Sequence, residues 1–254
     1  MVAYLTDKNS IGGVIAAMTL EEKALLLTGK SKAMSNSFEK YGIPAIISLD
    51  GISGINLNQY YMEAHTQNQL AENPDMEARI RAGSEGMFQI TEGMDAVTEV
   101  TEKGYRATNL SPEARKIVEY TNKNMLTNGK LPSSFPVGMA LGASWDRGLV
   151  YRIGAAVGKE AAAYRIDIVL GSPNVNIQRD PRNGRVFESF SEDPFLTASL
   201  APEIVKGVQD QGVGANVKHF AANNQETRRF DINEHISERA LYEIYLPGFK
   251  ACAE

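Results

Sequence analysis

The sequence has little of several features that mark whole classes of protein. Its 254 residues include a single cysteine, Cys252, so no disulfide can form within the chain. The three histidines, at positions 65, 219 and 235, do not stand in the Cys/His spacing of a zinc site, and we expect no metal. No apolar run approaches the length of a membrane span, and residues 1–13 lack the basic and apolar regions of a secretory signal. We therefore expect a cytoplasmic protein that does not enter a membrane.

Motifs for nucleotide and serine hydrolase chemistry are also missing. No G-x-G-x-x-G follows a predicted strand and no G-x-S-x-G occurs, so we expect no cofactor and no serine nucleophile. The 26 Lys and Arg residues against 31 Asp and Glu residues give a net charge of -5. This balance gives no electrostatic reason to expect a nucleic-acid partner or an anionic membrane surface. A neutral or cationic small substrate fits better.

What the sequence does contain is an alternation of helix and strand patterns. Continuous apolar runs predict buried strands at 43–49, 138–144, 166–172 and 214–220. Asp146 and the pair Asp193-Pro194 have the character of helix starts, and they predict helices after the second and third of these strands. Alternating strands and helices imply a parallel sheet, so we predict an α/β fold.

The stretch from about 56 to 130 differs in texture from the rest of the chain. It is polar, rich in Met and Glu, and contains helix-like pieces such as the one that starts at Ser111-Pro112. We interpret it as a mostly helical insertion in one α/β domain that spans residues 1–254. His65 and the pair Tyr60-Tyr61 could stack on a ligand there, although such residues more often pack in a core.

Polar side chains follow the predicted strands at their carboxyl ends. Asp50 comes at the end of the first strand, a polar loop from Gln178 to Pro194 follows the third, and Lys218-His219 lies at the end of the last. Because the carboxyl ends of parallel strands meet at one edge of a sheet, we expect these groups to converge on one pocket.

The same residues also have a purely structural interpretation. Lys218 and His219 can be a chance pair, with the imidazole satisfied in the core, and Arg182, Arg185 and Glu188 can be an ion-pair cluster that braces the loop. A ligand that suits carboxylates and cations together, without a metal or cofactor, is a sugar. Each hydroxyl donates and accepts, and an unpaired buried partner costs about 1–3 kcal/mol.

Two long motifs in register, RDPRNGRVFESFSEDP and VKHFAANNQETRR, resemble glycoside hydrolase family 3, which contains many bacterial and fungal β-glucosidases. Further segments are similar to that family in the same order: MTLEEKALLLTG, GIPAIISLDGISG, SFPVGMALGASWD and ISERALYEIYLPGF. The resemblance implies a (β/α)8 TIM-barrel-like domain whose pocket holds the terminal sugar of a β-glucoside or short β-linked oligosaccharide. The run Lys-His-Phe before Asn-Asn-Gln-Glu resembles the glucosidase branch more than the N-acetylglucosaminidase branch.

The resemblance also implies roles for single residues. Asp50 is expected to accept hydrogen bonds from sugar hydroxyls, and Arg185, Lys218 and His219 are expected to donate to them. Arg229 is similar to the family's arginine near the catalytic carboxylate. Three further residues are expected to lie behind the sugar-binding residues and to hold them in position: Glu188, Asn224 and Glu226.

The chemistry that the resemblance implies is retaining hydrolysis by two carboxylates about 5–5.5 Å apart. In the family the nucleophile is an aspartate in a Ser-Asp-Trp-like motif on a later barrel strand, and the acid/base comes from a further domain. We find neither in these 254 residues, because Trp145 stands in ASWD ahead of the arginine loop and Asp146 is better interpreted as a helix N-cap. We therefore assign no catalytic residue within the chain.

The length of the chain supports the same expectation. A complete barrel takes about 250 residues, and fewer than that are left once the insertion is set aside. We expect a barrel that is incomplete at its C-terminal side and inactive alone, completed by a complementing C-terminal segment, with a homo-oligomer as a further possibility. Three other functions stay open: a β-xylosidase, a β-glycoside phosphorylase, or a sugar-binding module without catalysis.

Overall fold

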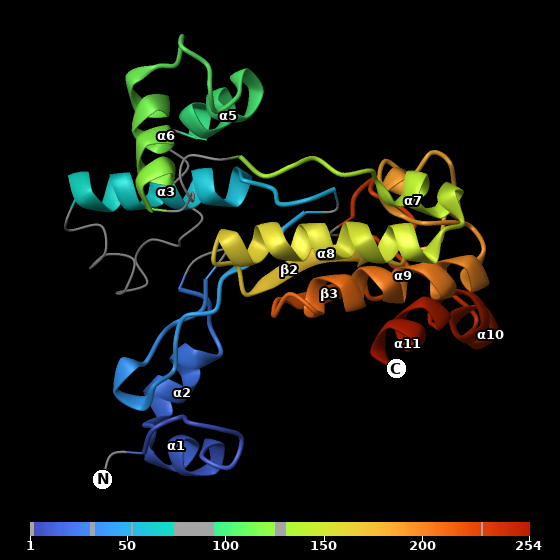
Figure 1. Cartoon of the computed structure of the whole chain (residues 1–254), viewed down its shortest axis with the longest axis horizontal. Helices are drawn as coiled ribbons and strands as arrows, with labels where there is room; N and C mark the ends of the chain where they lie inside the picture. Colours follow the sequence, from blue (N-terminus) through green and yellow to red (C-terminus); the bar gives the residue numbers. More distant parts are fainter. Residues whose placement is uncertain (1–2, 31–33, 52, 74–93, 125–130, 230) are drawn as a thin grey trace. The chain divides into compact units, whose positions relative to one another are not determined.

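The computed structural model describes residues 3–30, 34–51, 53–73, 94–124, 131–229 and 231–254 (Figure 1). Contacts divide the chain into two compact units, which are described separately. The first unit comprises residues 1–47 and 57–131, and the second comprises residues 48–56 and 132–254. The short segment 48–56 therefore belongs to the second unit, although both of its flanks belong to the first.

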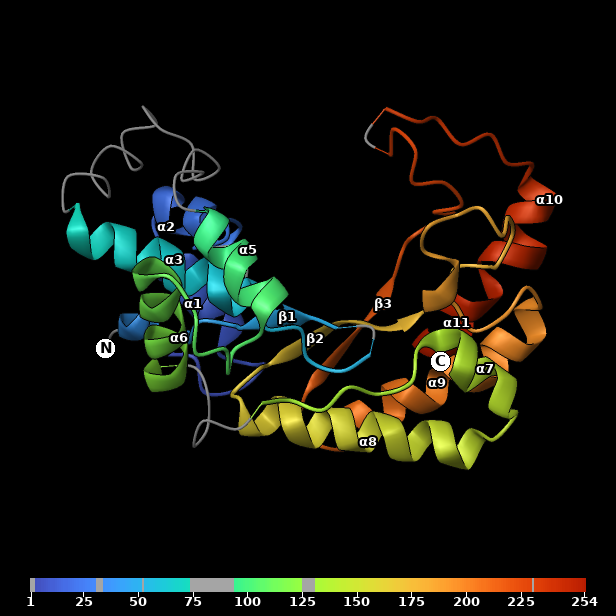
Figure 2. The same ribbon diagram turned by 90° about the horizontal axis from the view of Figure 1, so that it is seen from above.

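The second unit is built on a sheet of three parallel strands in the order β1 (Ser48–Asp50), β2 (Ile168–Asn174) and β3 (Gly214–Lys218) (Figure 2). Leu49 lies opposite Val169, and both are fully buried. Asn174 lies opposite Lys218. The predicted parallel sheet is confirmed for these strands, and their carboxyl ends share one edge.

Two long helices, α8 (Arg147–Ala163) and α9 (Pro194–Gln209), cover one face of this sheet (Figures 1 and 2). They approach each other closely at glycines: a Cβ built on Gly154 would lie 2.6 Å from the carbonyl oxygen of Ile204. A larger residue there would force the backbones apart, because interiors pack without spare space. Since α9 connects β2 to β3, the arrangement is a βαβ unit.

Both predicted helix starts are confirmed. Asp146 precedes α8, and its carboxylate accepts a hydrogen bond of 2.9 Å from the backbone N–H of Leu149. Asp193 does the same for α9, accepting from Phe195 N at 2.8 Å, and Pro194 occupies the first turn. These bonds satisfy N–H groups that have no partner inside the helix.

The end of the chain packs against the same layer. It runs through α10 (Glu238–Ala240), the π-helical turn η4 (Leu241–Tyr245) and α11 (Pro247–Ala253). The helix α11 packs on α9. Pro247 begins α11, where its missing N–H does no harm.

Two predicted strands differ in the structure. Residues 138–144 form the helix α7 (Gly138–Ser144), because a short apolar run does not by itself distinguish strand from helix. Gly138 and Gly142, four residues apart, let this helix touch the backbone of residues 188–190, where a Cβ on either would collide with a carbonyl. The strand predicted at 43–49 is reduced to Ser48–Asp50; Ile43 and Ile47 instead form isolated antiparallel bridges.

The first 47 residues of the other unit form α1 (Ile11–Ala17), α2 (Leu20–Leu26) and the 3-10 turn η1 (Glu39–Tyr41). A small core joins them, formed by Val14, Met18 and Tyr41. The α2 helix begins with a capping box, in which Thr19 and Glu22 exchange hydrogen bonds of 2.9 and 3.2 Å.

Within the range predicted as a helical insertion, the structure describes three helices that contact one another: α3 (Asn58–Glu72), α5 (Met94–Lys103) and α6 (Pro112–Asn124). The predicted start at Ser111-Pro112 is confirmed, with Ser111 Oγ accepting from Ala114 N at 3.2 Å. Tyr60, Tyr61 and His65 are buried in α3, which favours the packing interpretation. Residues 74–93 and 125–130 of the insertion lie outside the described residues.

The observed class is α/β, with helices on a small parallel sheet. The three strands are consistent with part of a (β/α)8 barrel, and closure of that barrel stays a prediction. No helix among the described residues is long and apolar enough to cross a membrane.

Candidate functional site

An ion pair ties the two outer strands of the sheet together at their carboxyl ends. The Nζ of Lys218 on β3 donates to Oδ1 of Asp50 on β1 at 2.7 Å. Between them on β2 stands Gly171, with a φ of +93°, and a Cβ there would overlap the end of the lysine side chain. The lysine can therefore reach across the middle strand only because that strand has no side chain at this point.

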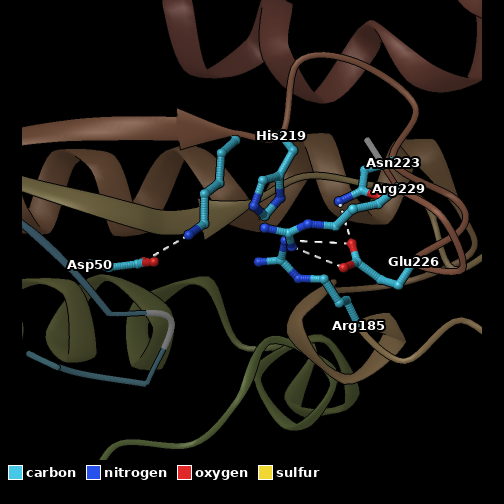
Figure 3. A pocket seen from close by; sticks show the side chains of 7 residues that line it. Asp50, Arg185, His219, Asn223, Glu226 and Arg229 are labelled. Carbon is cyan, nitrogen blue, oxygen red and sulfur yellow. Dashed lines mark hydrogen bonds and ion pairs between the residues drawn. The ribbon is translucent and has the colours of Figure 1, made fainter. Parts of the chain in front are cut away.

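This ion pair forms one end of a pocket of about 430 Å³ (Figure 3). Its lining consists of polar and charged side chains from the second unit: Asp50, Arg185, Lys218, His219, Asn223, Glu226 and Arg229. The sequence predicted that the first strand end, the polar loop and the last strand end would converge, and the structure shows this. All five residues predicted to bind the sugar line the pocket, together with Glu226, which was predicted to lie behind them.

Arg185 is held in a fixed orientation by a buried carboxylate. Its Nε and Nη2 donate to the two carboxylate oxygens of Glu188 at 2.8 and 2.9 Å, and Glu188 also accepts from Asn174 Nδ2 at 3.1 Å. The planar guanidinium matches the carboxylate in this two-bond geometry. Glu188 therefore orients Arg185 from outside the pocket lining, whereas the exposed Arg182 pairs with Asp180 and does not line the pocket.

Glu226 stands at the opposite end of the pocket between cations. It accepts from Arg229 Nη1 and Asn223 Nδ2, each at 3.0 Å, and Arg185 Nη1 lies 3.7 Å away. Burial alone would raise the pKa of Glu226, but these hydrogen bonds and the charge of Arg185 outweigh it, and the pKa lies below the usual value. Glu226 is therefore ionised at neutral pH.

His219 points into the pocket next to the guanidinium groups (Figure 3). Burial lowers the pKa of its imidazole to about 4, and the charges of Arg185 and Lys218 act in the same direction. The ring is therefore neutral at pH 7. Asn176 Nδ2 lies 3.3 Å from Nδ1 of the ring.

The amide-rich stretch after His219 places two neighbouring asparagines differently. Asn223 lines the pocket, whereas Asn224 points away from it and donates to the hydroxyl of Tyr245 at 3.1 Å. Asn224 thus lies outside the pocket lining, and its predicted support of the sugar-binding residues stays a prediction. The sequence missed Asn223, although its spacing of three from Glu226 was a signal that the two side chains could meet in a turn.

Comparison with known proteins identifies the family. The model of the glycosyl hydrolase family 3 N-terminal domain matches residues 120–254. The chain belongs to glycosyl hydrolase family 3. The resemblance predicted from the two long motifs is confirmed. In this chain the two motifs supply six of the seven residues that line the pocket, and Asp50 is the seventh.

Relatives of this family 3 chain include proteins named for more than one sugar. It is 37% identical to thermostable β-glucosidase B of Acetivibrio thermocellus over 93% of this chain and 23% of that protein. It is 48% identical to an exo-α-(1→6)-L-arabinopyranosidase of Bifidobacterium longum over 46% of this chain and 15% of that protein. The chain spans about a quarter or less of the length of these relatives.

Solved structures support the same assignment. The fold is similar to β-glucosidase 3B of Thermotoga neapolitana in complex with glucose, with a TM-score of 0.66 and 30% identity. This likeness covers 95% of the family 3 chain and 27% of that protein. Among the described residues, no group of three or more His, Cys, Asp or Glu side chains could hold a metal ion.

Proposed function

We propose that this chain forms the sugar-binding part of a retaining β-glucosidase that removes terminal, non-reducing β-D-glucosyl residues. The observation that carries the proposal is the alternation of donors and acceptors around one pocket. Lys218, Arg185 and Arg229 only donate hydrogen bonds, and Asp50 and Glu226 in their ionised form only accept. A sugar hydroxyl does both, so it can satisfy a cation and a carboxylate at the same time.

We propose further that the nucleophile and the acid/base come from polypeptide outside these 254 residues. Each carboxylate that lines the described pocket has a cation beside it: Lys218 for Asp50 and Arg229 for Glu226. An acid catalyst needs a raised pKa so that it carries a proton at working pH, whereas the pKa of Glu226 is lowered. Glu226 is therefore unsuited to that role.

The barrel belongs to the same proposal. Eight strands close a (β/α)8 barrel, and the family's active site lies at the carboxyl ends of its strands. The three described strands present their polar residues at that edge. We propose that further strands, supplied by polypeptide outside these residues, complete the wall of the pocket.

The first test is hydrolysis. Release of p-nitrophenol from its β-D-glucoside is measured for the 254-residue chain alone and for the full-length gene product that contains it. We expect activity only in the longer protein. Activity in the chain alone would show that the catalytic carboxylates are among these residues, and it would return attention to Asp50, Glu188 and Glu226.

The second test is sugar binding by the chain alone, measured by calorimetry and by saturation-transfer NMR with D-glucose. We expect binding that weakens when D-galactose or N-acetyl-D-glucosamine replaces glucose. Absence of binding to any sugar, in a chain that is folded by circular dichroism, would contradict the proposed pocket. Binding in the absence of hydrolysis by the longer protein would instead favour a sugar-binding module without catalysis.

A pentose-directed glycosidase is the second candidate, because the arabinopyranosidase relative is 48% identical over its matched segment. A pentopyranose lacks the hydroxymethyl group of glucose, and discrimination of one such group in a pocket amounts to about 1–3 kcal/mol. Comparison of D-glucose with D-xylose and L-arabinose in the same binding assay separates these substrates. Addition of inorganic phosphate to the hydrolysis assay, with detection of glucose 1-phosphate, tests for a phosphorylase.

A further inference from the structure

Two buried asparagines, one at the end of β2 and one two residues later, lie outside the pocket lining and yet are connected to residues that form it, directly or through Glu188. Asn174 is 2% exposed and Asn176 is 6% exposed. Asn174 holds Glu188, and through it Arg185, while Asn176 faces His219. Buried amides are costly to desolvate unless they are hydrogen-bonded. The orientation of each amide therefore shows which groups of its neighbours donate and which accept.

The amide of Asn174 can face only one way. Its Nδ2 donates to Oε2 of Glu188 at 3.1 Å, and because a carboxylate only accepts, the amide nitrogen must be on that side. Its Oδ1 then accepts the backbone N–H of Asn176 at 3.0 Å. The side-chain amide of Asn174 therefore fixes the backbone at Asn176 and, through Glu188, also holds Arg185 in place.

Main-chain pairing brings Asn176 next to the histidine. The backbone N–H of Val175 donates to the carbonyl of Lys218 at 2.8 Å, so the residues that follow each of them lie side by side. Asn176 Nδ2 is 3.3 Å from His219 Nδ1, and Asn176 Oδ1 is buried without a hydrogen-bond partner among the described residues. Turning the amide over would place both N–H hydrogens where Oδ1 now lies without a partner, and orphaned buried N–H groups are rarer than orphaned carbonyl oxygens.

We propose that Asn176 is a positioning residue that fixes the tautomer of His219: its amide donates to Nδ1, so the neutral imidazole carries its proton on Nε2 and offers the ligand only a donor. The tautomer of a neutral histidine is set by the hydrogen bond that its other nitrogen makes. Here that partner is an amide N–H, which requires an unprotonated Nδ1.

Burial, helped by neighbouring charges, keeps the ring of His219 neutral, so that a single tautomer can be defined. Arg185 from the polar loop and Lys218 from the end of β3 disfavour the imidazolium, while Glu188 and Asp50 oppose them more weakly. Burial is the largest cause, and the combined effect is a pKa lowered to about 4. At pH 7 the ring is therefore uncharged and carries one proton.

The tautomer deepens the proposed sugar site, and this step alone rests on that proposed function. With Nε2 protonated, the histidine joins Lys218 and Arg185 as a donor, and the hydroxyl in front of it must accept from the ring. The proton of that hydroxyl is then left for an acceptor such as Asp50 or Glu226. With Nδ1 protonated instead, Nε2 would be an acceptor, and the hydroxyl would have to turn around.

The decisive measurement is the protonation of the two ring nitrogens in the ligand-free chain, by ¹⁵N–¹H two-bond correlation NMR at pH 7. Comparison with His219→Gln assigns the signals, because the chain has only three histidines. We expect a protonated Nε2 and an unprotonated Nδ1. A protonated Nδ1, or a rapid average of both tautomers, would overturn the proposal without reference to any sugar.

A variant tests the cause. In Asn176→Asp the new carboxylate can only accept, so we expect the proton to move to Nδ1, the titration of His219 to shift to higher pH, and glucose binding to weaken by about tenfold. The matched control is Asn233→Asp, which alters an exposed Asn–His pair in which Nδ2 lies 3.4 Å from His235 Nε2, and it should leave His219 and glucose binding unchanged.

The outcomes separate the two proposals. If Asn176→Asp keeps the proton on Nε2 and binds glucose normally, Asn176 does not set the tautomer. If the wild-type chain shows the expected tautomer and the variant reverses it, but neither binds glucose, the positioning role stands and the sugar site fails. Misfolding of the variant leaves the wild-type measurement to decide.

Discussion

At the scale of single residues, the pocket consists of charges that are oriented before any ligand arrives. Arg185 is held through two nitrogens by Glu188, which leaves Nη1 on the side of Glu226. Such pre-orientation lowers the entropic cost of binding, because these side chains lose little further freedom when a ligand enters. A substitution that keeps the positive charge but loses the two-bond contact with Glu188 therefore tests whether ligand binding depends on the geometry of Arg185 or on its charge alone.

We expect Arg185→Lys to weaken glucose binding by more than about tenfold, since lysine cannot make the two-bond contact and leaves the buried Glu188 poorly paired. Calorimetry with glucose measures the change. The control is Arg182→Lys, which alters an exposed arginine paired with Asp180 and should bind as the wild type does. Equal binding by both variants would contradict the role given to Arg185.

His219 gives a second prediction, on stability. Burial lowers the pKa of its imidazole in the folded chain to about 4, from the ordinary value of 6.5 that we expect in the unfolded chain, so the unfolded state binds more protons between these values. The free energy of unfolding should therefore fall as the pH falls from 6.5 toward 4. Urea unfolding at a series of pH values measures this slope.

The slope should become shallower in His219→Gln, because the group that takes up the proton on unfolding is gone. His235→Gln serves as the control, since His235 is exposed. A slope that is the same in wild type and His219→Gln would show that other groups cause it.

The residues of the pocket were predictable to different degrees. Asp50 and Lys218 could be placed because each ends a strand, and parallel strand ends must meet. Asn223 had only its spacing from Glu226 as a signal, and nothing in the sequence pointed to Asn176 behind the pocket, because side-chain direction outside regular elements depends on backbone angles that residue type alone does not fix. The contact between Asn176 and His219 depends on main-chain pairing between segments more than forty residues apart.

At the scale of elements, glycines decide how closely the helices pack. The Cβ of any residue at position 207 would lie 2.6 Å from the backbone nitrogen of Ala155, and position 154 meets Ile204 in the same way. The sequence predicted both helices from their caps and length. The sequence did not predict their contact. A glycine within a helix lowers helix propensity, and the sequence alone does not show whether it is there to allow close packing.

We expect Gly154→Val to lower the free energy of unfolding by about 1–3 kcal/mol, since the added side chain has no room between α8 and α9. Urea unfolding followed by circular dichroism measures it. Gly12→Ala is the control, because nothing lies within 4 Å of the added methyl group. A Gly154→Val chain as stable as the wild type would show that the helices can separate without penalty.

At the scale of the whole molecule, the second unit is assembled from two stretches of chain. Its residues 48–56 and 132–254 meet where the N–H of Phe135 donates to the carbonyl of Ser53 at 2.8 Å. The two stretches of the second unit are therefore in contact on either side of residues 57–131. The interpretation of that range as an insertion stays a prediction, which rests on the composition change near residues 56 and 130.

Replacement of residues 57–131 by a short Gly/Ser linker should accordingly leave the second unit folded and its glucose binding unchanged. Circular dichroism and calorimetry with glucose measure these two properties. The control removes residues 48–131 and so takes away β1 with Asp50; we expect it to lose binding. Loss of folding in the first variant would show that the insertion supports the sheet.

Gly171 on β2 has consequences for the pocket as well as for the sheet. It leaves room for the side chain of Lys218 to cross from β3 to Asp50 on β1, so the ion pair at this end of the pocket depends on a residue without a side chain. In a saturation screen for growth on a glucoside, position 171 should tolerate substitution as poorly as the residues that line the pocket. Mutational intolerance at a glycine inside a strand would then report on the proposed sugar binding, in addition to the folding of the sheet.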